Sequence, residues 1–386
     1  MRVAIISDVW WPHWKGGGER RYHELATRLG QRGHEITALT MHTWDGPSVL
    51  RPSPNVEVVG ICPDLGVGAH RNARHMLRWA NAVMSVLPDL QADVVECLAF
   101  PYAAAFAIAR HCRRRDIPLV CTWHEYYGWW HWRRERPLFA PGIVALERMA
   151  TRLGNRVVAV SEFTADRLRR VGVQDSRLRV IHNGVDQAAI DRSEPWGDTY
   201  DALFVGRLIG AKRVDLLLRG LSGVPGVTMG VVGDGDARAA YEALTQSLGV
   251  ADRVSFLGSL PEDAQVWGQM KRSRVLVVPS QREGFGLVAG EANAAGVPVL
   301  AAEFPGSATA RLVTEGRFHG VTCPPTSEGM ATALARVFAG HSCDRCADVC
   351  RAAARRWSWE TAVDATEALY LELAGAGEQL AIAGGD

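Results

Sequence analysis

Short runs of apolar and β-branched residues recur along the first half of the chain, and polar or helical stretches separate them. The first run, Val3 to Ser7, precedes a loop with three glycines at 16–18 and a helical pattern that begins at Glu19. Gly33 is expected to end this helix before a second strand. Later runs occur at 56–61, 94–97, 119–121 and 157–160. Such alternation predicts a doubly wound, largely parallel sheet covered by helices.

The same pattern starts again after a charged stretch at 185–201 that contains Pro195 and Gly197. Its predicted strands lie at 202–205, 228–232, 254–257, 275–279 and 297–301. We therefore expect an N-terminal Rossmann-like domain over residues 1–190 and a C-terminal one over residues 198–358. Open α/β sheets bind ligands beyond the carboxyl ends of their strands, so two such sheets facing each other predict an inter-domain cleft.

A last helical pattern covers residues 359–376. It places Ala362, Ala365, Leu369 and Leu373 on one stripe. This apolar stripe is expected to pack back across both domains.

Composition and charge exclude several classes of partner. The 386 residues are 47% hydrophobic and 22% charged, which allows two or three domains with sizeable cores. A formal net charge of +1 argues against nucleic acid as a partner. No secretory signal is visible, and the apolar stretch at 100–109 is too short to span a membrane. These features predict a cytoplasmic protein, and they do not indicate its oligomeric state.

Three of the eight cysteines, Cys343, Cys346 and Cys350, lie close together. Metal sites use similar spacings, but His341 is the only further candidate ligand nearby. Spacings of three and four residues also place side chains on one face of a helix. We favour the helix face and expect no metal ion.

The loop after the predicted strand at 202–205 collects groups that suit an anion. Gly206, Arg207 and Lys212 place two cations where a strand ends and a helix begins, beside backbone N–H groups. A diphosphate fits this arrangement, and so do two ordinary surface cations. Gly233 and Gly235 follow the next strand and let the backbone approach a ligand, which is a weak indication because Gly-Asp-Gly is common in turns.

The stretch QREGFGLVAGE places two carboxylates around a glycine turn. Glu283 is expected at a strand tip, where it can accept hydrogen bonds from sugar hydroxyls. Glu291 is expected one turn into a helix, where it can accept both hydroxyls of a ribose. Glycines on both sides of Phe285 let the loop pass close to a ligand. The N–H groups of Gly286 and Leu287 open the helix toward a phosphate.

EGFGLVAGE resembles the Glu-x7-Glu motif of the family 4 retaining glycosyltransferases, which have the two-domain GT-B fold. Further stretches lie in the order expected of that family: KGGGERR, VSEFTADRL, VIHNGVD, FVGRLIGAKR, VGDGDAR and FLG. The resemblance covers nearly the whole chain, and the combination is more specific than any single piece. The departures at VAGEANAAGVPVLA from the family pattern, which is closer to xxxEAMAxGxPVxA, are mild.

The resemblance implies that the C-terminal domain holds a nucleotide-diphosphate sugar. Arg207 and Lys212 would neutralise the departing diphosphate. Glu283 would bind the hydroxyls of the donor sugar, and Glu291 would bind the ribose.

The resemblance also implies roles in the N-terminal domain. Gly16 and Gly17 would close over the phosphates. His124, just after the strand at 119–121, would line the reaction centre. Ser161 and Asn183 match motif positions without a firm catalytic role.

Glycosyl transfer places particular demands on charge. Positive charge develops on the sugar and negative charge on the diphosphate, so preorganised cations are the natural catalyst. Neither an Asp-x-Asp metal site nor a protein nucleophile is evident in the sequence. We expect no metal or other cofactor, because two side-chain cations and helix N-termini can take the place of a metal ion. The resemblance implies a front-face attack with retention, in which the departing phosphate accepts the acceptor's proton. Uridine is favoured as the base because such enzymes use it most often.

Two aromatic stretches, DVWWPHWKGG and WHEYYGWWHWRRERP, follow N-terminal strands, where the family's acceptors bind. Flat rings suit sugars, and carboxylates suit an amino sugar or aminocyclitol. The second stretch also interleaves aromatic residues with arginines at 133, 134 and 136, as in a patch that contacts an anionic membrane surface. A third interpretation is core packing. The acceptor candidates are Asp8, Trp11, Glu19, Glu125, Tyr126 and Trp129.

The expected activity is transfer of a hexose or amino-hexose from a nucleotide-diphosphate sugar to a hydroxyl group. Small saccharides, aminocyclitols or other secondary metabolites, and lipid-linked molecules all remain open as acceptors. The same fold also serves sugar-nucleotide epimerases and sugar phosphorylases. An inactive binding protein is a further alternative, but it has little need of Arg207, Lys212, Glu283 and Glu291 together.

Overall fold

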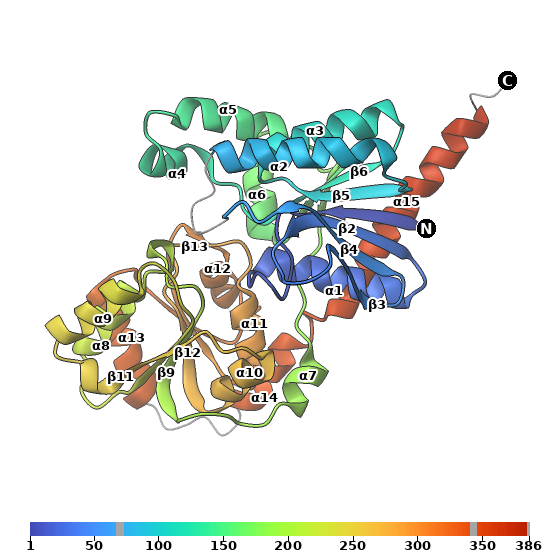
Figure 1. Ribbon diagram of the computed structural model, residues 1–386. Helices are drawn as coiled ribbons and strands as arrows, with labels where there is room; N and C mark the ends of the chain where they lie inside the picture. Colours follow the sequence, from blue (N-terminus) through green and yellow to red (C-terminus); the bar gives the residue numbers. More distant parts are fainter. Residues whose placement is uncertain (67–72, 340–345, 384–386) are drawn as a thin grey trace. The chain divides into compact units, whose positions relative to one another are not determined.

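The computed structural model describes residues 1–66, 73–339 and 346–383 (Figure 1). The chain forms two compact units. The first unit consists of Met1–Asn183 together with Trp359–Asp386, and the second consists of Gly184–Ser358. The second unit is therefore continuous in sequence, whereas the C-terminal segment completes the first.

The first unit is built on one eight-stranded sheet. Its strands are β1 (Arg2–Ile6), β2 (Glu35–His42), β3 (Val49–Ser53), β4 (Val56–Pro63), β5 (Val94–Leu98), β6 (Leu119–Trp123), β7 (Arg156–Ala159) and β8 (Leu178–Val180). They lie in the order β3-β4-β2-β1-β5-β6-β7-β8, and every neighbouring pair is parallel except β3 and β4. Strands β3 and β8 were not predicted, because β3 is a half-exposed edge strand and β8 has only three residues.

Helices cover both faces of this sheet, as the alternating pattern predicted. They are α1 (Gly17–Gln31), α2 (Ala73–Val86), α3 (Tyr102–Arg114), α4 (Gly128–Glu135), α5 (Ala140–Ala150), α6 (Glu162–Arg170) and α15 (Trp359–Ala383). In Figure 1, α2 and α3 lie on one face of the strands, and α1 and α15 lie on the other. The core under α2 and α3 includes Ile6, Trp79, Val95, Ile108 and Trp123, each at most 3% exposed.

The second unit repeats this architecture with six parallel strands. These are β9 (Tyr200–Val205), β10 (Met229–Val232), β11 (Val254–Gly258), β12 (Ser273–Val278), β14 (Val299–Ala302) and β16 (Gly320–Cys323), in the order β11-β10-β9-β12-β14-β16. Two short strands, β13 (Arg282–Glu283) and β15 (Gly306–Ser307), pair outside the sheet. The helices are α7 (Gln187–Arg192), α8 (Val214–Ser222), α9 (Arg238–Ser247), α10 (Asp263–Lys271), α11 (Leu287–Ala294), α12 (Ala308–Thr314), α13 (Ser327–Ala339) and α14 (Cys346–Ala354).

Each sheet reverses its strand order at one point. The reversal lies between β1 and β5 in the first unit and between β9 and β12 in the second. Ligands of doubly wound sheets bind beyond the carboxyl ends of the strands at such a reversal. The loops after β1, β9 and β12 carry most of the candidate residues, so the topology places them where this fold binds ligands.

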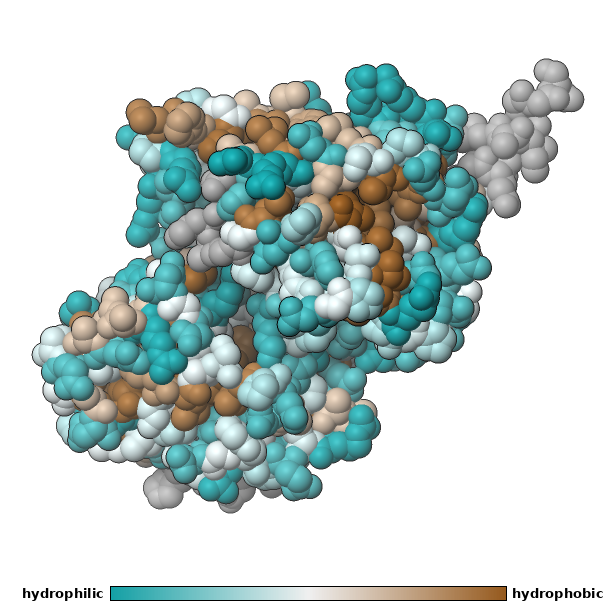
Figure 2. All heavy atoms as spheres, in the orientation of Figure 1, coloured by the Kyte–Doolittle hydropathy of each residue, from teal (hydrophilic) through white to brown (hydrophobic). Residues whose placement is uncertain are grey.

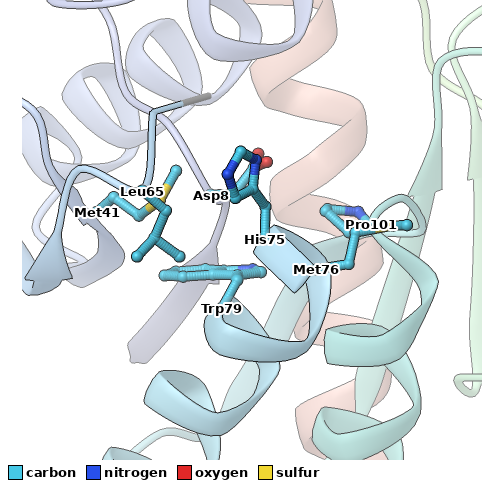
Figure 3. A pocket seen from close by; sticks show the side chains of 7 residues that line it. All are labelled: Asp8, Met41, Leu65, His75, Met76, Trp79 and Pro101. Carbon is cyan, nitrogen blue, oxygen red and sulfur yellow. The ribbon is translucent and has the colours of Figure 1, made fainter. Parts of the chain in front are cut away.

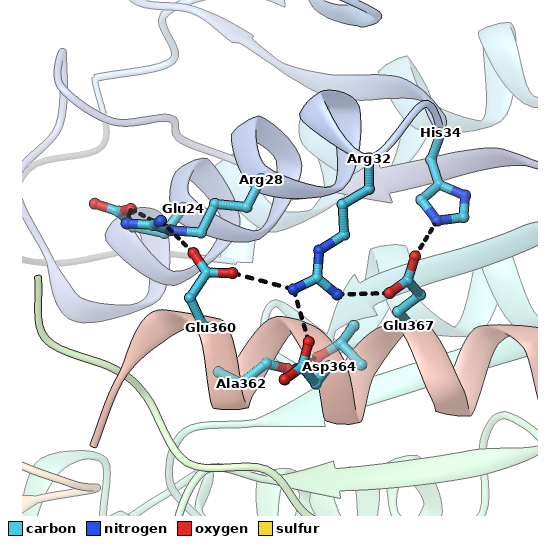
Figure 4. Close-up of polar contacts among 9 residues, drawn as sticks. Glu24, Arg28, Arg32, His34, Glu360, Ala362, Asp364 and Glu367 are labelled. Carbon is cyan, nitrogen blue, oxygen red and sulfur yellow. Dashed lines mark hydrogen bonds and ion pairs between the residues drawn. The ribbon is translucent and has the colours of Figure 1, made fainter. Parts of the chain in front are cut away.

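Helix α15 is attached to α1 by a row of ion pairs (Figure 4). Arg32 contacts Glu360, Asp364 and Glu367 at 3.0, 2.6 and 2.6 Å. Arg28 also contacts Glu360, at 2.6 Å. Isolated surface ion pairs contribute little to stability, but a row with shared partners fixes the position of one helix on another.

The buried face of α15 differs in one position from the predicted stripe. Ala362, Leu369 and Leu373 are buried, but Ala365 is exposed and Thr366 takes its place. The cause is the position of Val363 and Tyr370, which are also buried and shift the centre of the contact face. On the inner side of the helix, the Tyr370 hydroxyl donates to Glu96 of β5 at 2.5 Å.

The cysteine cluster lies partly outside the described residues, because Cys343 is not among them. Cys346 begins α14, and Cys350 is fully buried in the same helix. Within the described ranges, no three His, Cys, Asp or Glu side chains come together as metal ligands.

In the part of the chain that the structure covers, no helix combines the length and the apolar character needed to cross a bilayer.

Candidate functional site

The loops after β9 and β12 meet at the strand reversal of the second unit. The Gln281 N–H donates to the Ala211 carbonyl at 2.9 Å, which joins the two backbones. Beside this bond, Lys212 Nζ lies 2.6 Å from Glu283 Oε1. Only 22% of the lysine side chain and 12% of the glutamate side chain are exposed. The sequence-predicted cation and carboxylate therefore form one ion pair.

Glycines fix the shape of the loop after β9, which carries Arg207 and Lys212. Gly233 has φ 127°, and a Cβ there would lie 2.0 Å from the carbonyl oxygen of Gly206. A Cβ at Gly235 would lie 2.4 Å from the carbonyl oxygen of Leu208. These glycines therefore let the loop after β10 pack closely against the loop after β9. The predicted contact of Gly233 and Gly235 with a donor would use their backbone atoms. Arg207 lies between Gly206 and Leu208. Its side chain is exposed and forms no ion pair with any carboxylate in the described ranges.

The sequence suggested that Glu283 lies at the tip of a core strand, but the structure places it elsewhere. Strand β12 ends at Val278, and Glu283 belongs to β13, whose partner is β15. This extra pairing holds the residue by its backbone, so the carboxylate position does not depend on a free loop.

Aromatic packing supports the turn after Glu283. The Phe285 ring is only 3% exposed and packs at 5.8 Å from Phe318 and 5.3 Å from Trp357. Its predicted contact with a donor is therefore limited to its backbone. Gly286 has φ 88°, and a Cβ there would lie 2.0 Å from Thr309 Oγ1. Only glycine fits this position.

Helix α11 begins directly after this turn. Its first N–H groups, at Leu287 and the next residues, have no acceptor within the helix itself. They carry the positive end of the helix dipole, which suits a phosphate. Glu291 lies four residues after Leu287 on the same helix face and is partly exposed.

In the first unit, the glycine loop after β1 meets the residue after β6. Gly16 caps α1 without a side chain, and a Cβ there would lie 2.2 Å from Glu19 Oε2. A Cβ at Gly18 would lie 3.4 Å from His124 Nε2. The structure therefore brings His124 against the glycine loop, with Gly17 as the first residue of the helix between them.

His124 is neutral in this environment. Burial, and next the charge of Arg21, lower the pKa of His124 to about 3. Its Nε2 atom is buried and has no hydrogen-bond partner among the described residues. A neutral imidazole can donate one hydrogen bond to a ligand or accept one from it, but it carries no positive charge near pH 7.

The acceptor candidates differ in their exposure to solvent. Glu19 and Tyr126 are buried at 8% and 7% exposure, whereas Trp129 is 42% exposed. Trp11 is partly exposed, with Arg20 5.0 Å from its ring centre. Glu125 is also partly exposed.

Asp8 is 2% exposed and faces a small pocket beyond the ends of β1 and β2 (Figure 3). The other lining residues are Met41, Leu65, His75, Met76, Trp79 and Pro101. Most of this lining is apolar.

Comparison with known proteins covers almost the whole chain. The family model described as Glycosyltransferase Family 4 matches residues 15–189, and the model described as Glycosyl transferases group 1 matches residues 186–356. The chain belongs to the family 4 glycosyltransferases.

Some relatives of this glycosyltransferase are distant in sequence but align with nearly the whole chain. Glycogen synthase of Mycobacterium tuberculosis (strain CDC 1551 / Oshkosh) is 26% identical over 405 residues, which cover 96% of this chain and 94% of that protein. Sucrose-phosphate synthase from Thermosynechococcus elongatus has a TM-score of 0.82 at 20% identity, covering 97% and 99% of the two chains. HepE from Anabaena in complex with UDP-glucose has a TM-score of 0.71 at 20% identity, covering 96% and 99%. These structural likenesses confirm the predicted GT-B fold.

The glycosyltransferase holds its His124 loop with residues that sequence analysis missed. Thr164 Oγ1 donates to the His124 carbonyl at 3.1 Å, and an Arg167 N–H donates to the Tyr126 carbonyl at 2.9 Å. Glu147 accepts the next two backbone N–H groups, those of Tyr127 and Gly128, at 2.8 and 2.9 Å.

Glu147 also accepts the Tyr102 hydroxyl at 2.8 Å and Trp132 Nε1 at 3.2 Å. Burial raises the pKa of this carboxyl, and the four hydrogen bonds offset part of the rise. The available signal was a glutamate on the apolar face of α5, in line with the buried Ala140 and Ala150.

Two further motif residues have structural partners in the glycosyltransferase. Ser161 caps α6 by accepting the Thr164 N–H at 3.1 Å. Asn183 Oδ1 accepts from the fully buried Arg21 at 3.1 Å, beside the Ile181 carbonyl at 3.0 Å. Both residues therefore hold loops in place.

Replacing His124 by asparagine is expected to make the fold less sensitive to acid. A folded-state pKa of about 3, against 6.5 for an unperturbed histidine, means that only the unfolded state binds this proton between those values. The unfolding free energy of the wild type therefore falls as the pH drops from 6.5 toward 3, by up to about 1.4 kcal/mol per pH unit from this group. Urea unfolding at several pH values measures both slopes. Equal slopes would contradict a His124 that is neutral in the folded state.

Proposed function

We propose that this glycosyltransferase moves a hexose or amino-hexose, with retention, from a UDP-sugar to an acceptor hydroxyl. The Lys212–Glu283 ion pair carries the proposal, because it joins a cation for the diphosphate to a carboxylate for the sugar within 2.6 Å. Arg207 and the start of α11 add positive potential on the same side of the sheet. UDP is favoured because HepE, a structural neighbour, binds UDP-glucose.

The chemical step needs no group beyond the two substrates and the protein. The bond between the anomeric carbon and the diphosphate breaks, and the acceptor oxygen forms its new bond on the same face of the sugar. The acceptor's proton passes to a departing phosphate oxygen. Arg207 and Lys212 stabilise the negative charge that builds on the diphosphate. Neutral His124 is assigned a hydrogen bond to a sugar hydroxyl, since it lacks a proton to give as an acid near pH 7.

Several classes of acceptor fit the aromatic side chains after the N-terminal strands. A small saccharide, an aminocyclitol or other secondary metabolite, and a lipid-linked molecule are all compatible with Trp11 and Trp129. A lipid-linked acceptor would require the enzyme to meet a membrane surface. We place the reaction in the cytoplasm, because the seven described cysteines are all free thiols, as in a reducing compartment.

Binding of the nucleotide tests the donor site directly. With EDTA present, UDP at 100 times its dissociation constant is expected to stabilise the wild type by roughly 2.7 kcal/mol, while GDP, ADP and dTDP do less. Glu291→Ala is expected to lose most of this effect, because the ribose loses its carboxylate partner. Thermal unfolding of both proteins with each nucleotide is the measurement.

The control is Glu328→Ala, which removes an exposed helical carboxylate of the same unit. It should keep the full response to UDP. Equal stabilisation of Glu291→Ala and the wild type would remove the ribose role. A response to UDP only after addition of a divalent metal would remove the metal-free donor site.

The alternatives make different predictions about the substrates. An epimerase interconverts a sugar nucleotide without any acceptor, and a phosphorylase consumes free phosphate in place of a nucleotide. An inactive binding protein responds to the nucleotide but releases none from a nucleotide sugar. Chromatography of the reaction mixtures distinguishes all three from transfer.

A further inference from the structure

Large apolar side chains are exposed on one part of the first unit. Of the twelve that are strongly exposed in the described residues, six lie between Trp129 and Met149. Leu138, Trp130 and Phe139 are 89%, 77% and 69% exposed. In Figure 2, hydrophobic colours gather over α5 and its connection from α4. We call this the α4–α5 face; its apolar members are Trp129, Trp130, Leu138, Phe139, Leu146 and Met149.

The charge on this face is one-sided. Residues 128–152 contain five arginines and two glutamates, and one of the glutamates, Glu147, is fully buried. Glu135 is therefore the only exposed acid in the stretch. The five arginines form no ion pair with a carboxylate in the part of the chain that the structure covers. They are Arg133, Arg134, Arg136, Arg148 and Arg152.

The face is held rigidly in spite of its exposure. Glu147 of α5 accepts Trp132 Nε1 and the N–H groups of Tyr127 and Gly128, where α4 begins. Arg133 lies 5.9 Å from the Trp130 ring centre. These contacts hold α4 and α5 against each other, so the apolar side chains on the helices and on the link between them project from a well-ordered backbone.

Apolar and aromatic side chains at the level of uncommitted arginines match the interfacial zone of a bilayer. Leucine and phenylalanine enter the boundary of the acyl chains, tryptophan prefers the headgroup level, and arginine attracts anionic lipid. A sugar acceptor would use the aromatic rings but would gain nothing from Leu138 or Met149. An acidic protein partner would use the arginines but rarely needs so much apolar surface without acids.

We propose that the α4–α5 face docks the enzyme on a bilayer that carries anionic lipid. The apolar residues at 138 and 139 enter the interface, and the arginines at 133, 134 and 136 bind the headgroups. The docking does not depend on the donor or the acceptor, so it stands apart from the proposed reaction.

Flotation with lipid vesicles tests this docking. The full-length protein is expected to float with vesicles of phosphatidylcholine containing phosphatidylglycerol and to stay behind with phosphatidylcholine alone. The triple variant Arg133→Gln/Arg134→Gln/Arg136→Gln is expected to bind about 100-fold more weakly. The double variant Leu138→Ser/Phe139→Ser is expected to lose about tenfold or more.

Matched controls separate this face from general charge and hydrophobicity. Arg219→Gln/Arg355→Gln/Arg356→Gln removes three exposed arginines of the second unit, and Leu371→Ser removes an exposed leucine of α15. Both should float as the wild type does. Thermal unfolding should be unchanged in every variant, since the altered side chains are exposed. No flotation of the wild type, or equal flotation of the face variants and their controls, would overturn the proposal.

Discussion

Lys212→Met is expected to lower kcat by about 10²–10³-fold, because it removes a preorganised cation from the departing diphosphate. The lysine is held in place before any ligand arrives, by its 2.6 Å contact with Glu283 and by a backbone bond from Gln281 to the neighbouring Ala211. In the proposed reaction, negative charge grows on the diphosphate, so kcat should fall more than KM rises. Release of UDP from a nucleotide sugar measures both constants.

The ion pair requires a control for folding. Removal of Lys212 leaves Glu283 partly buried without its cation, so the double variant Lys212→Met/Glu283→Gln removes both charges and separates a local rearrangement from the loss of catalysis. Arg219→Met, which changes an exposed side chain of α8, should leave kcat unchanged. Wild-type turnover by Lys212→Met would show that the cation does not act on the leaving group.

Glu147→Leu is expected to destabilise the protein by about 3 kcal/mol or more, because four buried or partly buried donors lose their acceptor. Two of them are backbone N–H groups, at Tyr127 and Gly128, which cannot turn toward water without moving the loop. The others are the Tyr102 hydroxyl and the Trp132 indole N–H. Urea unfolding, followed by tryptophan fluorescence, measures the change.

Glu147→Gln serves as the control of similar size. It keeps one carbonyl oxygen as an acceptor but brings an amide N–H against the donors, so an intermediate loss is expected. The exposed Glu135→Gln of α4 should change stability by less than about 0.5 kcal/mol. A Glu147→Leu protein as stable as the wild type would mean that the loop does not depend on this carboxylate.

The central strands could be predicted because buried parallel strands are almost purely apolar. The runs at 94–97 and 119–121 lie within β5 and β6, whose residues are nearly all buried. The edge strands β3 and β16 are partly exposed and lack this pattern, so nothing in their composition separates them from loops. Local periodicity therefore predicts the central strands of both sheets, and of their four edge strands in the described structure it predicts β11 alone.

The candidate site followed the same division. Lys212 and Glu283 could be predicted because each lies where an apolar strand gives way to a glycine-rich loop. The contacts of Glu147 could not, since they join α5 to residues 15, 19, 20 and 45 positions away along the chain. The burial of the Phe285 ring depends in the same way on Phe318 and Trp357, which follow later in the sequence. Roles that rest on such packing need the tertiary structure.

The row of ion pairs between α1 and α15 has a consequence for biosynthesis. Residues of α1 and β5 leave the ribosome long before Glu360, Asp364 and Tyr370 are synthesised. Arg32 and Glu96 can therefore form these contacts only after the end of the chain has been translated. The second unit is contiguous and can complete its sheet while α15 is still being translated. The unit that opens the chain is thus the last to be completed. A message truncated just before α15 would yield a complete second unit attached to an incomplete first unit.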